Sequence, residues 1–263
     1  MMRLLSIEWL KISKYVTFWV LAGLFVVLLL LWNWSISSGV LKLGGGSDFN
    51  FISSNYSYPA VWDNVAYWTK FFSGLLSIVI IILTTNEFQY RTNRQNVIDG
   101  WKRQEFYHAK WLVVVSLSLV VTLFTMLLGV FFAFTHGAPI TGFTNNISKM
   151  GSVFILTLNY FGFALLLSLL LKRSGVAIII FLLYCYVVEI MLQQLLNWKM
   201  TSHPGDLLPL QCSAELISFP LADMLKKMSH KTGPSQNILA CASIGWIAIY
   251  YIAGRIQMLK SNW

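Results

Sequence analysis

Glu189 is an acidic residue inside a long apolar run, and an ionisable group at such a position is by default a candidate functional residue. Tyr186, Gln193 and Asn197 lie at helical spacing from it, so the four would form a polar stripe that leads toward the outer end of the run. We interpret this stripe as part of an outer gate or of a wall lining a transport path. The other interpretation is that Glu189 is protonated or paired within the bundle and only determines helix packing.

The second group of reactive side chains is a charged block at residues 86–110, between two apolar runs. A charge inside hydrocarbon costs several kcal/mol, so this block must lie in water or among lipid headgroups. Sequence compatible with a helix continues to Ile98, and Asp99-Gly100 then ends it, because glycine readily adopts the backbone angles that terminate a helix. The block predicts a short helix outside the membrane, with a polar surface that includes Gln89, Arg91, Arg94 and Gln95.

Motifs of catalysis are missing from the sequence. It contains no phosphate-binding loop of the Gly-x-x-x-x-Gly-Lys type, no His-Glu-x-x-His and no Gly-x-Ser-x-Gly, and its four histidines are scattered. The three cysteines share no Cys-x-x-Cys spacing, so we interpret them as small packing residues. We expect no enzyme activity, metal site or cofactor in this polypeptide alone.

The composition is that of an integral membrane protein. Hydrophobic residues make up 57% and charged residues 11% of the 263 residues, whereas soluble domains carry roughly 25% charged residues. The net charge is +9, and the cations lie near the ends of apolar runs. This placement indicates contact with anionic lipid headgroups rather than binding of nucleic acid.

Six apolar runs of about the length needed to cross a membrane predict an all-α protein with a single transmembrane domain. A tight break at residues 172–175 makes the fourth and fifth spans a helical hairpin. In the third span, Ser118, Thr122, Thr125 and Gly129 share one face, which is typical of a close helix–helix contact. The predicted spans are about 16–34, 67–85, 111–135, 152–171, 175–196 and 238–254.

Residues 1–15 predict an amphipathic helix on the membrane surface. Leu5, Trp9, Ile12 and Val16 form an apolar stripe at helical spacing, and the opposite side carries three cations, Arg3, Lys11 and Lys14. With this helix inside the cell, twelve of the nineteen lysines and arginines lie on the cytoplasmic side. The distribution predicts that both termini are cytoplasmic.

The last outer loop, residues 197–237, begins with polar residues and then becomes apolar, with interruptions at Pro209 and Pro220. This pattern predicts two short helices that lie at, or dip into, the outer leaflet. An ordinary folded loop outside the membrane is the alternative.

Together these features resemble the permease subunits of type-2 ATP-binding-cassette (ABC) exporters over nearly the whole chain. The resemblance rests on the amphipathic start with Glu8-Trp9-Leu10-Lys11, the six spans, the charged loop and the Leu208-Pro209 element of the last outer loop. Arg91-Thr92 stands where the family usually has Gly-Thr. The charged loop contributes the series Glu87, Thr92, Arg94, Gly100, Arg103 and Lys110.

The resemblance implies that a separate ATPase subunit, which binds ATP and Mg, drives this chain. The loop helix would be a coupling helix that docks on the ATPase, with the interfacial helix and its Glu8, Trp9 and Lys11 packed beside it. Two permease copies, identical or different, would form an exporter with two ATPase copies in a bacterial inner membrane. The implied ATPase contacts are Glu87, Gln89, Arg91, Thr92, Arg94, Gln95, Gly100 and Arg103.

Two other functions remain open. The chain could be an ATP-independent channel or a proton-coupled carrier that uses Glu189, or an accessory subunit whose charged loop only recruits a partner. Secondary carriers usually show internal repeats and several buried charges, whereas this sequence has one such acid and no clear repeat. This argues against a secondary carrier, and the resemblance implies an exporter, with its substrate unidentified.

Overall fold

The structure is a computed structural model that describes residues 2–38, 56–92, 102–139, 142–200, 203–217 and 233–260. Every regular element in these ranges is a helix. A helix satisfies its backbone hydrogen bonds within its own segment, which is what a chain that crosses hydrocarbon requires. In chain order the elements are α1 (Met2–Ser13), α2 (Val16–Ser37), α3 (Ala60–Gln89), α5 (Arg103–Thr135), α6 (Ser148–Leu171), α7 (Ser174–Leu183), the π-helical turn η2 (Tyr184–Val188), α8 (Glu189–Lys199), the 3-10 turn η3 (Pro204–Leu207), α9 (Gln211–Ala214) and α11 (Gln236–Lys260).

Six helices among the described residues are long and apolar enough to span a membrane. They are α2, α3, α5, α6, α11 and the continuous helix made of α7, η2 and α8. The shortest has 22 residues, which exceeds the roughly 20 residues that crossing a bilayer needs. The prediction of an all-helical chain with six helices of membrane-spanning character is confirmed.

Several helices extend past the predicted apolar runs at their polar ends. α5 begins at Arg103 instead of residue 111, and α11 ends at Lys260 instead of residue 254. An apolar run marks only the part of a helix suited to hydrocarbon, whereas the helix itself continues until its backbone is capped. At the start of α5 the carboxylate of Glu105 provides such a cap by accepting the N–H of Lys102 at 2.9 Å.

α6 is the centre of the bundle, since it packs against α3, α5 and α11. In the apolar windows of α3 and α6, 61% of residues are buried, against 22% for α2, for α11 and for the α7–α8 helix. The outer helices therefore offer most of their apolar side chains to lipid, while α3 and α6 form the protein core.

The predicted contact face of the third span is confirmed and belongs to the α3–α5 interface. The hydroxyl groups of Thr69 and Thr125 lie 3.1 Å apart across this interface, and Ser118 is fully buried. Gly129 lies against the indole of Trp62, where an added Cβ would come within 2.6 Å of the ring. Glycine is therefore needed at this position for the close approach of the tryptophan.

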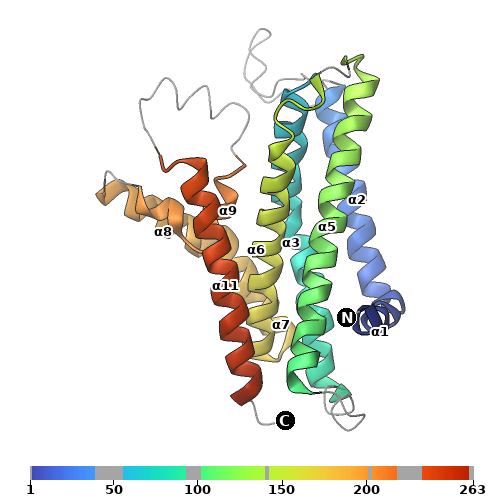
Figure 1. Ribbon diagram of the computed structural model, residues 1–263, viewed down its shortest axis with the longest axis vertical. Helices are drawn as coiled ribbons and strands as arrows, with labels where there is room; N and C mark the ends of the chain where they lie inside the picture. The colour runs from blue at the N-terminus through green and yellow to red at the C-terminus, as the bar shows by residue number, and fades with distance from the viewer. Residues whose placement is uncertain are drawn as a thin grey trace.

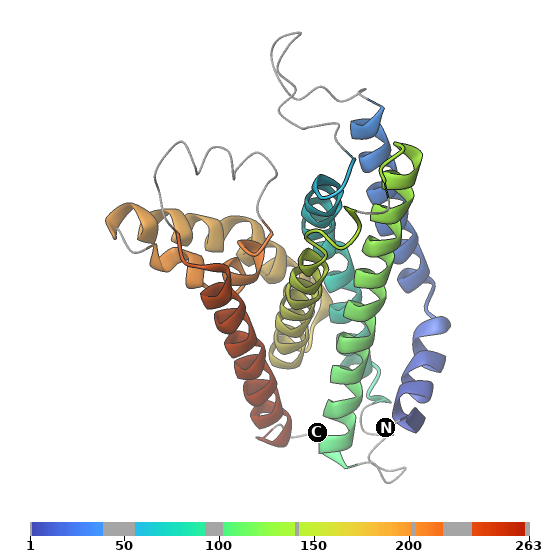
Figure 2. The same cartoon turned by 45° about the horizontal axis from the view of Figure 1, so that its top comes forward.

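α1 is seen end-on in Figure 1, so it runs across the long axis of the bundle, whereas α2 runs along it. The turned view in Figure 2 shows α1 below α2 at the same end of the bundle as the end of α11. Both ends of the chain thus lie at one end of the bundle, as six spans require. We call this end the lower end, after its place in Figure 1.

The fifth span departs from the bundle direction. Beyond the turn η2, α8 extends sideways in both views (Figures 1 and 2). The segment that follows contains the two short helices η3 and α9, both packed against α8 and α11. This segment, residues 203–217, is the described part of the predicted helical outer loop; Pro220 lies outside the described residues.

The predicted coupling helix lies mostly outside the described residues. α3 continues to Gln89 and ends in a turn at Tyr90 and Arg91, and the description resumes at Lys102. Arg94, Gln95 and Gly100 are therefore among the residues of the charged loop that the structure does not describe.

Candidate functional site

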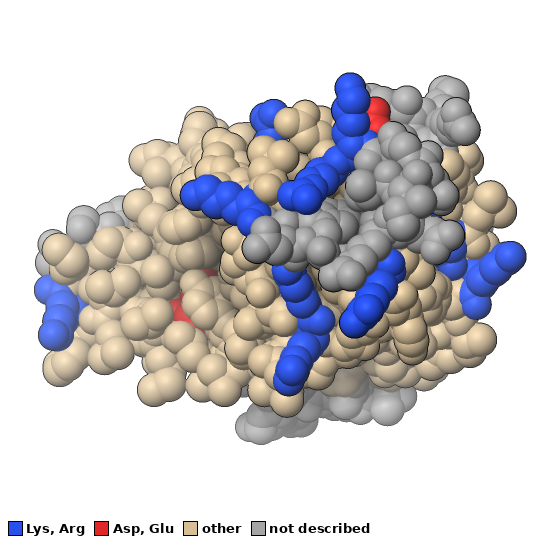
Figure 3. Space-filling view, turned by 90° about the horizontal axis from the view of Figure 1, so that it is seen from below, with Lys and Arg blue, Asp and Glu red and all other residues tan. Residues whose placement is uncertain are grey.

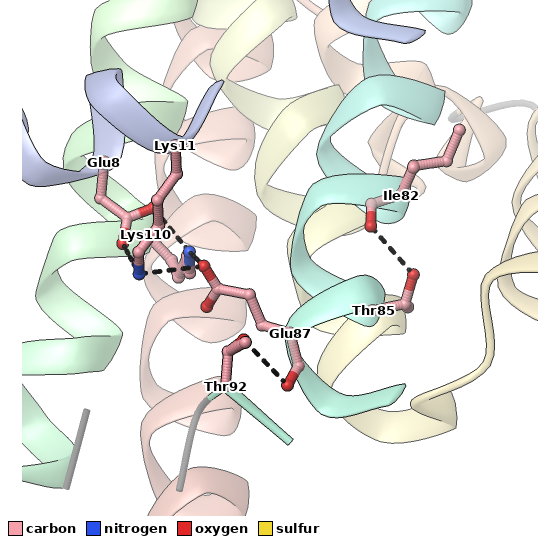
Figure 4. A network of polar contacts seen from close by, with 7 residues as sticks. All are labelled: Glu8, Lys11, Ile82, Thr85, Glu87, Thr92 and Lys110. Carbon is pink, nitrogen blue, oxygen red and sulfur yellow. Dashed lines mark hydrogen bonds and ion pairs between the residues drawn. The ribbon is translucent and has the colours of Figure 1, made fainter. Parts of the chain in front are cut away.

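Four charged side chains from three helices meet at the lower end of the bundle (Figure 4). Lys110 Nζ of α5 lies 2.6 Å from Glu8 Oε2 of α1 and 2.8 Å from Glu87 Oε1 of α3. Lys11 Nζ of α1 lies 3.3 Å from Glu8 Oε1 and 3.2 Å from Glu87 Oε1. Each ammonium group contacts both carboxylates, and we call these four residues the charge cluster.

The positions of these residues along their helices explain the meeting. Glu8 and Lys11 are three residues apart on α1, so they face the same side. Glu87 lies in the last turn of α3, and Lys110 lies two turns into α5. The charge cluster therefore connects α1 to both helices that flank the charged loop.

The charge cluster is a buried salt bridge network with no net formal charge. The side chains of Lys110, Glu8 and Glu87 are 5%, 3% and 9% exposed, and that of Lys11 is 29% exposed. Burial disfavours the charged form of Glu8, but the Lys110 and Lys11 ammonium groups outweigh it and hold the pKa of Glu8 below its ordinary value. Glu8 is therefore a carboxylate at neutral pH.

The periodicity of residues 1–15 predicts Lys11 opposite the apolar stripe, on the side that a surface helix turns to water, but its ion pairs with Glu8 and Glu87 place it against the bundle. Lys11 points toward the bundle with Glu8, while Trp9 of the apolar stripe is 54% exposed. A periodicity argument assigns charges to the aqueous side of a helix. Here the inner side is charged because α3 and α5 supply charges of opposite sign, and Trp9 is free to face lipid.

The other residues predicted to contact an ATPase lie around the ends of α3 and α5. Gln89, Arg91 and Arg103 are exposed, and the Thr92 hydroxyl donates to the backbone carbonyl of Glu87 at 3.4 Å. The guanidinium of Arg103 donates to the Leu259 carbonyl at 3.3 Å, which links the start of α5 to the end of α11. Apart from buried Glu87, the described residues of this set are therefore exposed polar residues at the end of α3 and the start of α5.

The charge cluster is an ion-paired connection between helices. No described group of three or more His, Cys, Asp or Glu side chains could hold a metal ion. Both carboxylates of the charge cluster contact lysine ammonium groups, while Glu87 Oε2 is buried without a hydrogen-bond partner among the described residues. The geometry provides an ion-paired connection among the middle of α1, the end of α3 and the first turns of α5.

Glu189 is the centre of a second polar site at the other end of the bundle. It is fully buried, and its Oε1 accepts the backbone N–H groups of Leu210 (2.6 Å) and Gln211 (3.2 Å) at the start of α9. Its Oε2 is buried without a hydrogen-bond partner among the described residues. The carboxyl group thus joins α8 to the segment 203–217.

The polar stripe on α8 continues this connection. Gln193 donates to Asp206 at 2.9 Å, and Asn197 donates to the same carboxylate at 2.8 Å while accepting the Gly205 N–H at 2.9 Å. Gly205 permits this contact, because an added Cβ would lie 2.5 Å from the Gln193 carbonyl oxygen. Within the described chain the stripe therefore faces a packed segment.

Tyr186, predicted to share this face, does not join it. Its hydroxyl donates to the Phe71 carbonyl of α3 at 3.1 Å, and the residue is 40% exposed. The prediction assumed regular helical spacing, but the π-helical turn η2 contains Tyr186 and inserts extra length into the helix. This turn rotates Tyr186 away from the face that carries Glu189.

Two further residues belong to the second site, although their place there was not predicted from the sequence. The Asn159 amide donates to Pro209 O at 2.8 Å and to Ser213 Oγ at 2.9 Å, and Lys70 donates to Ala214 O at 2.6 Å. Each is an isolated polar residue at the edge of an apolar run or inside it. This isolation is the one feature of the sequence that could have indicated a buried polar contact. Their carbonyl partners cannot be identified from side-chain patterns.

Comparison with protein families matches residues 45–253 to the family described as "Protein of unknown function (DUF2705)". The match covers well over half of the chain. The chain belongs to this family. No curated protein matches the chain.

The region matched to the DUF2705 family contains Glu87, Lys110 and Glu189, but not Glu8 or Lys11. The α3–α5 half of the charge cluster and the whole second site therefore lie inside the family match, whereas the α1 half precedes it. The family description names no activity, so the function has to be inferred from the two sites.

Proposed function

We propose that this chain is the permease subunit of an ABC exporter, driven by ATP hydrolysis in a separate ATPase subunit. Two permease copies, identical or different, would form the path, and the substrate would move outward by alternating access. The chain would lie in a bacterial inner membrane with both termini in the cytoplasm.

The observation that carries this proposal is the charge cluster. The loop on which an ATPase would dock connects α3 to α5, and the ion pairs of Glu87 and Lys110 join both helices to α1. α1 leads into α2 through Lys14 and Tyr15 alone. A displacement of the loop would therefore reach the first membrane span, which is what coupling to an external motor requires.

A loop that served only to set topology would not need this arrangement. Removing charges from water is expensive, and a buried network repays the cost only with good geometry. The three buried members of the charge cluster meet at 2.6 and 2.8 Å, so their charges are closely matched. Such matching is expected if α1, α3 and α5 must move together. It therefore supports a coupling function for the loop rather than a function in topology alone.

The charge distribution supports the proposed orientation. Figure 3 shows the lower end, where lysine and arginine side chains project and acidic side chains are sparse. Exposed cations at this end include Lys14, Arg91, Lys102, Arg103, Arg173, Arg255 and Lys260. Cytoplasmic segments of membrane proteins carry such an excess of positive charge.

A proton-coupled carrier is the second candidate, and it is favoured by the buried Oε2 of Glu189, which has no hydrogen-bond partner in the part of the chain that the structure describes. Against it, the other oxygen of the same carboxyl is held by two backbone N–H groups, which suits a structural anchor. An accessory subunit that only recruits a partner is a third candidate. Recruitment alone would not require the connection to α1 that the charge cluster provides.

Purification of the tagged chain from its native membrane in a mild detergent, followed by mass spectrometry, tests the proposal. We expect an ATP-binding-cassette subunit in stoichiometric amount. Recovery of the chain alone, under conditions that preserve ABC complexes, would contradict the proposal and favour the carrier.

Charge reversal in the loop tests where the ATPase binds. The triple variant Arg91→Glu, Arg94→Glu and Arg103→Glu should lose the ATPase while it retains its helical content. The matched control reverses three cations at the same end outside the loop, namely Lys172, Arg173 and Arg255, and should retain the ATPase. Equal loss in both variants would show a general charge effect and reject the coupling loop.

A further inference from the structure

An apolar groove lies between α1 and the lower halves of α2, α3 and α5. Its volume is about 420 Å³, which falls in the range of roughly 300–1,000 Å³ typical of ligand sites. Trp9 of α1, Ala22 of α2 and Leu117 and Val120 of α5 are among the residues that line it. Ser116 is its one polar lining residue, and its hydroxyl already donates to the Val113 carbonyl at 3.0 Å.

The groove exists because α1 does not continue along α2. The chain turns at Lys14 and Tyr15, and the charge cluster holds α1 against α3 and α5. The rings of Trp9 and Phe18 meet edge to face at 6.5 Å, and the Trp19 indole donates to the Ser13 carbonyl at 2.9 Å. These contacts build one wall of the groove from the α1–α2 junction.

The basic lower end, rather than the neutral charge cluster, indicates the occupant of the groove. The charge cluster lies in an adjoining pocket that shares Ile12, Leu83 and Val113 with the groove. Lys14 is exposed in the α1–α2 turn, two positions after the lining residue Ile12, and lysine and arginine side chains gather on the lower end (Figure 3). An apolar groove stays free of water, and a basic membrane surface attracts anionic headgroups. The complementary ligand has one hydrocarbon chain to insert and an anionic head.

We propose that the groove binds one acyl chain of an anionic phospholipid, with the lipid phosphate beside Lys14. The bound chain fills the space between α1 and the lower parts of α2 and α5, and so stabilises the position from which Glu8 and Lys11 reach the charge cluster. This site concerns a resident lipid and does not depend on the proposed transport function.

Photolabelling tests the site. The purified chain is placed in nanodiscs containing a small fraction of phosphatidylglycerol with a photoreactive diazirine in mid-chain, and labelled peptides are identified by mass spectrometry. We expect severalfold more label on the peptide with Leu117 and Val120 than on α11, where Ile244 and Ile252 face lipid. Equal labelling of the two helices would reject the site.

Two variants and a control make the test specific. Ala22→Phe fills the groove from α2, and Ser116→Phe fills it from α5. Each variant should reduce groove labelling severalfold, so one of them still provides the test if the other does not fold. Gly23→Phe, on the same helix, projects into open space and should leave labelling unchanged. Labelling that persists in both filled variants would overturn the proposal.

The headgroup is tested separately. Phosphatidylcholine with the same photoreactive chain should label the groove severalfold less than phosphatidylglycerol, and Lys14→Gln should remove most of this difference. If both lipids label equally in the unaltered chain, the assignment to an anionic phospholipid is wrong.

Discussion

The ammonium group of Lys110 lies 2.6 Å from Glu8, a residue 102 positions earlier in the chain. This contact closes the largest sequence separation within the charge cluster and joins α5 to α1. Lys110 also binds Glu87 of α3, so one buried cation holds three helices together. The stability of the lower end should therefore depend on this residue more than on any exposed lysine.

Lys110→Met should destabilise the protein by about 3–5 kcal/mol, because it leaves two buried carboxylates without their main cation. Thermal unfolding in detergent, followed by circular dichroism, measures the effect. Lys260→Met removes an exposed cation at the same end and is the control, with an expected change within about 0.5 kcal/mol.

A double variant measures the interaction between Glu8 and Lys110 separately from the effect of each residue alone. Glu8→Gln combined with Lys110→Met should cost less than the sum of the two single changes, because the second change removes a charge already left unpaired. Strict additivity would show that the two residues act independently and would argue against the charge cluster.

Acid should weaken the attachment of α1. The ordinary pKa of a glutamate is 4.5, and that of Glu8 in the folded chain is lower, so the unfolded chain takes up this proton first. The stability from ionised Glu8 is then complete above the ordinary pKa and is lost as the pH falls through the lower, folded value. The difference in unfolding temperature between the unaltered protein and Glu8→Gln should be largest at neutral pH and shrink below about pH 5. A difference independent of pH would contradict this.

The six helices could be predicted from the sequence because their signal is local. An apolar run of sufficient length becomes a membrane helix whatever it packs against. The helix ends were less predictable, since the polar extensions of α3, α5 and α11 continue past the hydrocarbon-compatible run.

The charge cluster could be predicted in its residues but not in its contacts. Glu8, Lys11, Glu87 and Lys110 all belong to charged motifs, but near the ends of apolar runs such residues look like solvated topology signals. Only the position of α1 across the bundle brings them together, and this depends on the turn at residues 14–15 rather than on any spacing. The same holds for Glu189, whose partners are backbone N–H groups that carry no side-chain signal.

The end of α3 offers a test of backbone strain. Arg91 has a φ of 57°, in the left-handed region that glycine adopts most easily at the position after a helix. Arg91→Gly should be more stable than Arg91→Ala by up to about 1 kcal/mol, because both lose the charge but only glycine relieves the strain. The comparison uses thermal unfolding of the two variants. Equal stability would mean that the turn does not retain this conformation in solution.

Glu189 provides the sharpest distinction between anchoring and proton transfer. Glu189→Leu removes the acceptor of two buried backbone N–H groups, at a cost of about 1–3 kcal/mol for each group left unsatisfied, and should release residues 203–217 from α8. Glu189→Gln keeps an acceptor oxygen and should hold the segment in place. Gln194→Leu, at an exposed position on the same helix, is the control.

The buried thiol of Cys212 in α9 reports release of the segment. In a Cys241→Ser background, which removes the exposed cysteine, a thiol reagent should modify Cys212 faster in Glu189→Leu than in Glu189→Gln or Gln194→Leu. Equal protection in all three variants would show that the carboxyl does not anchor the segment. If Glu189→Gln is as stable and protected as the unaltered protein but transports nothing, the ionisable proton itself is required, which supports the carrier. Full transport by Glu189→Gln would leave anchoring as the role of this residue.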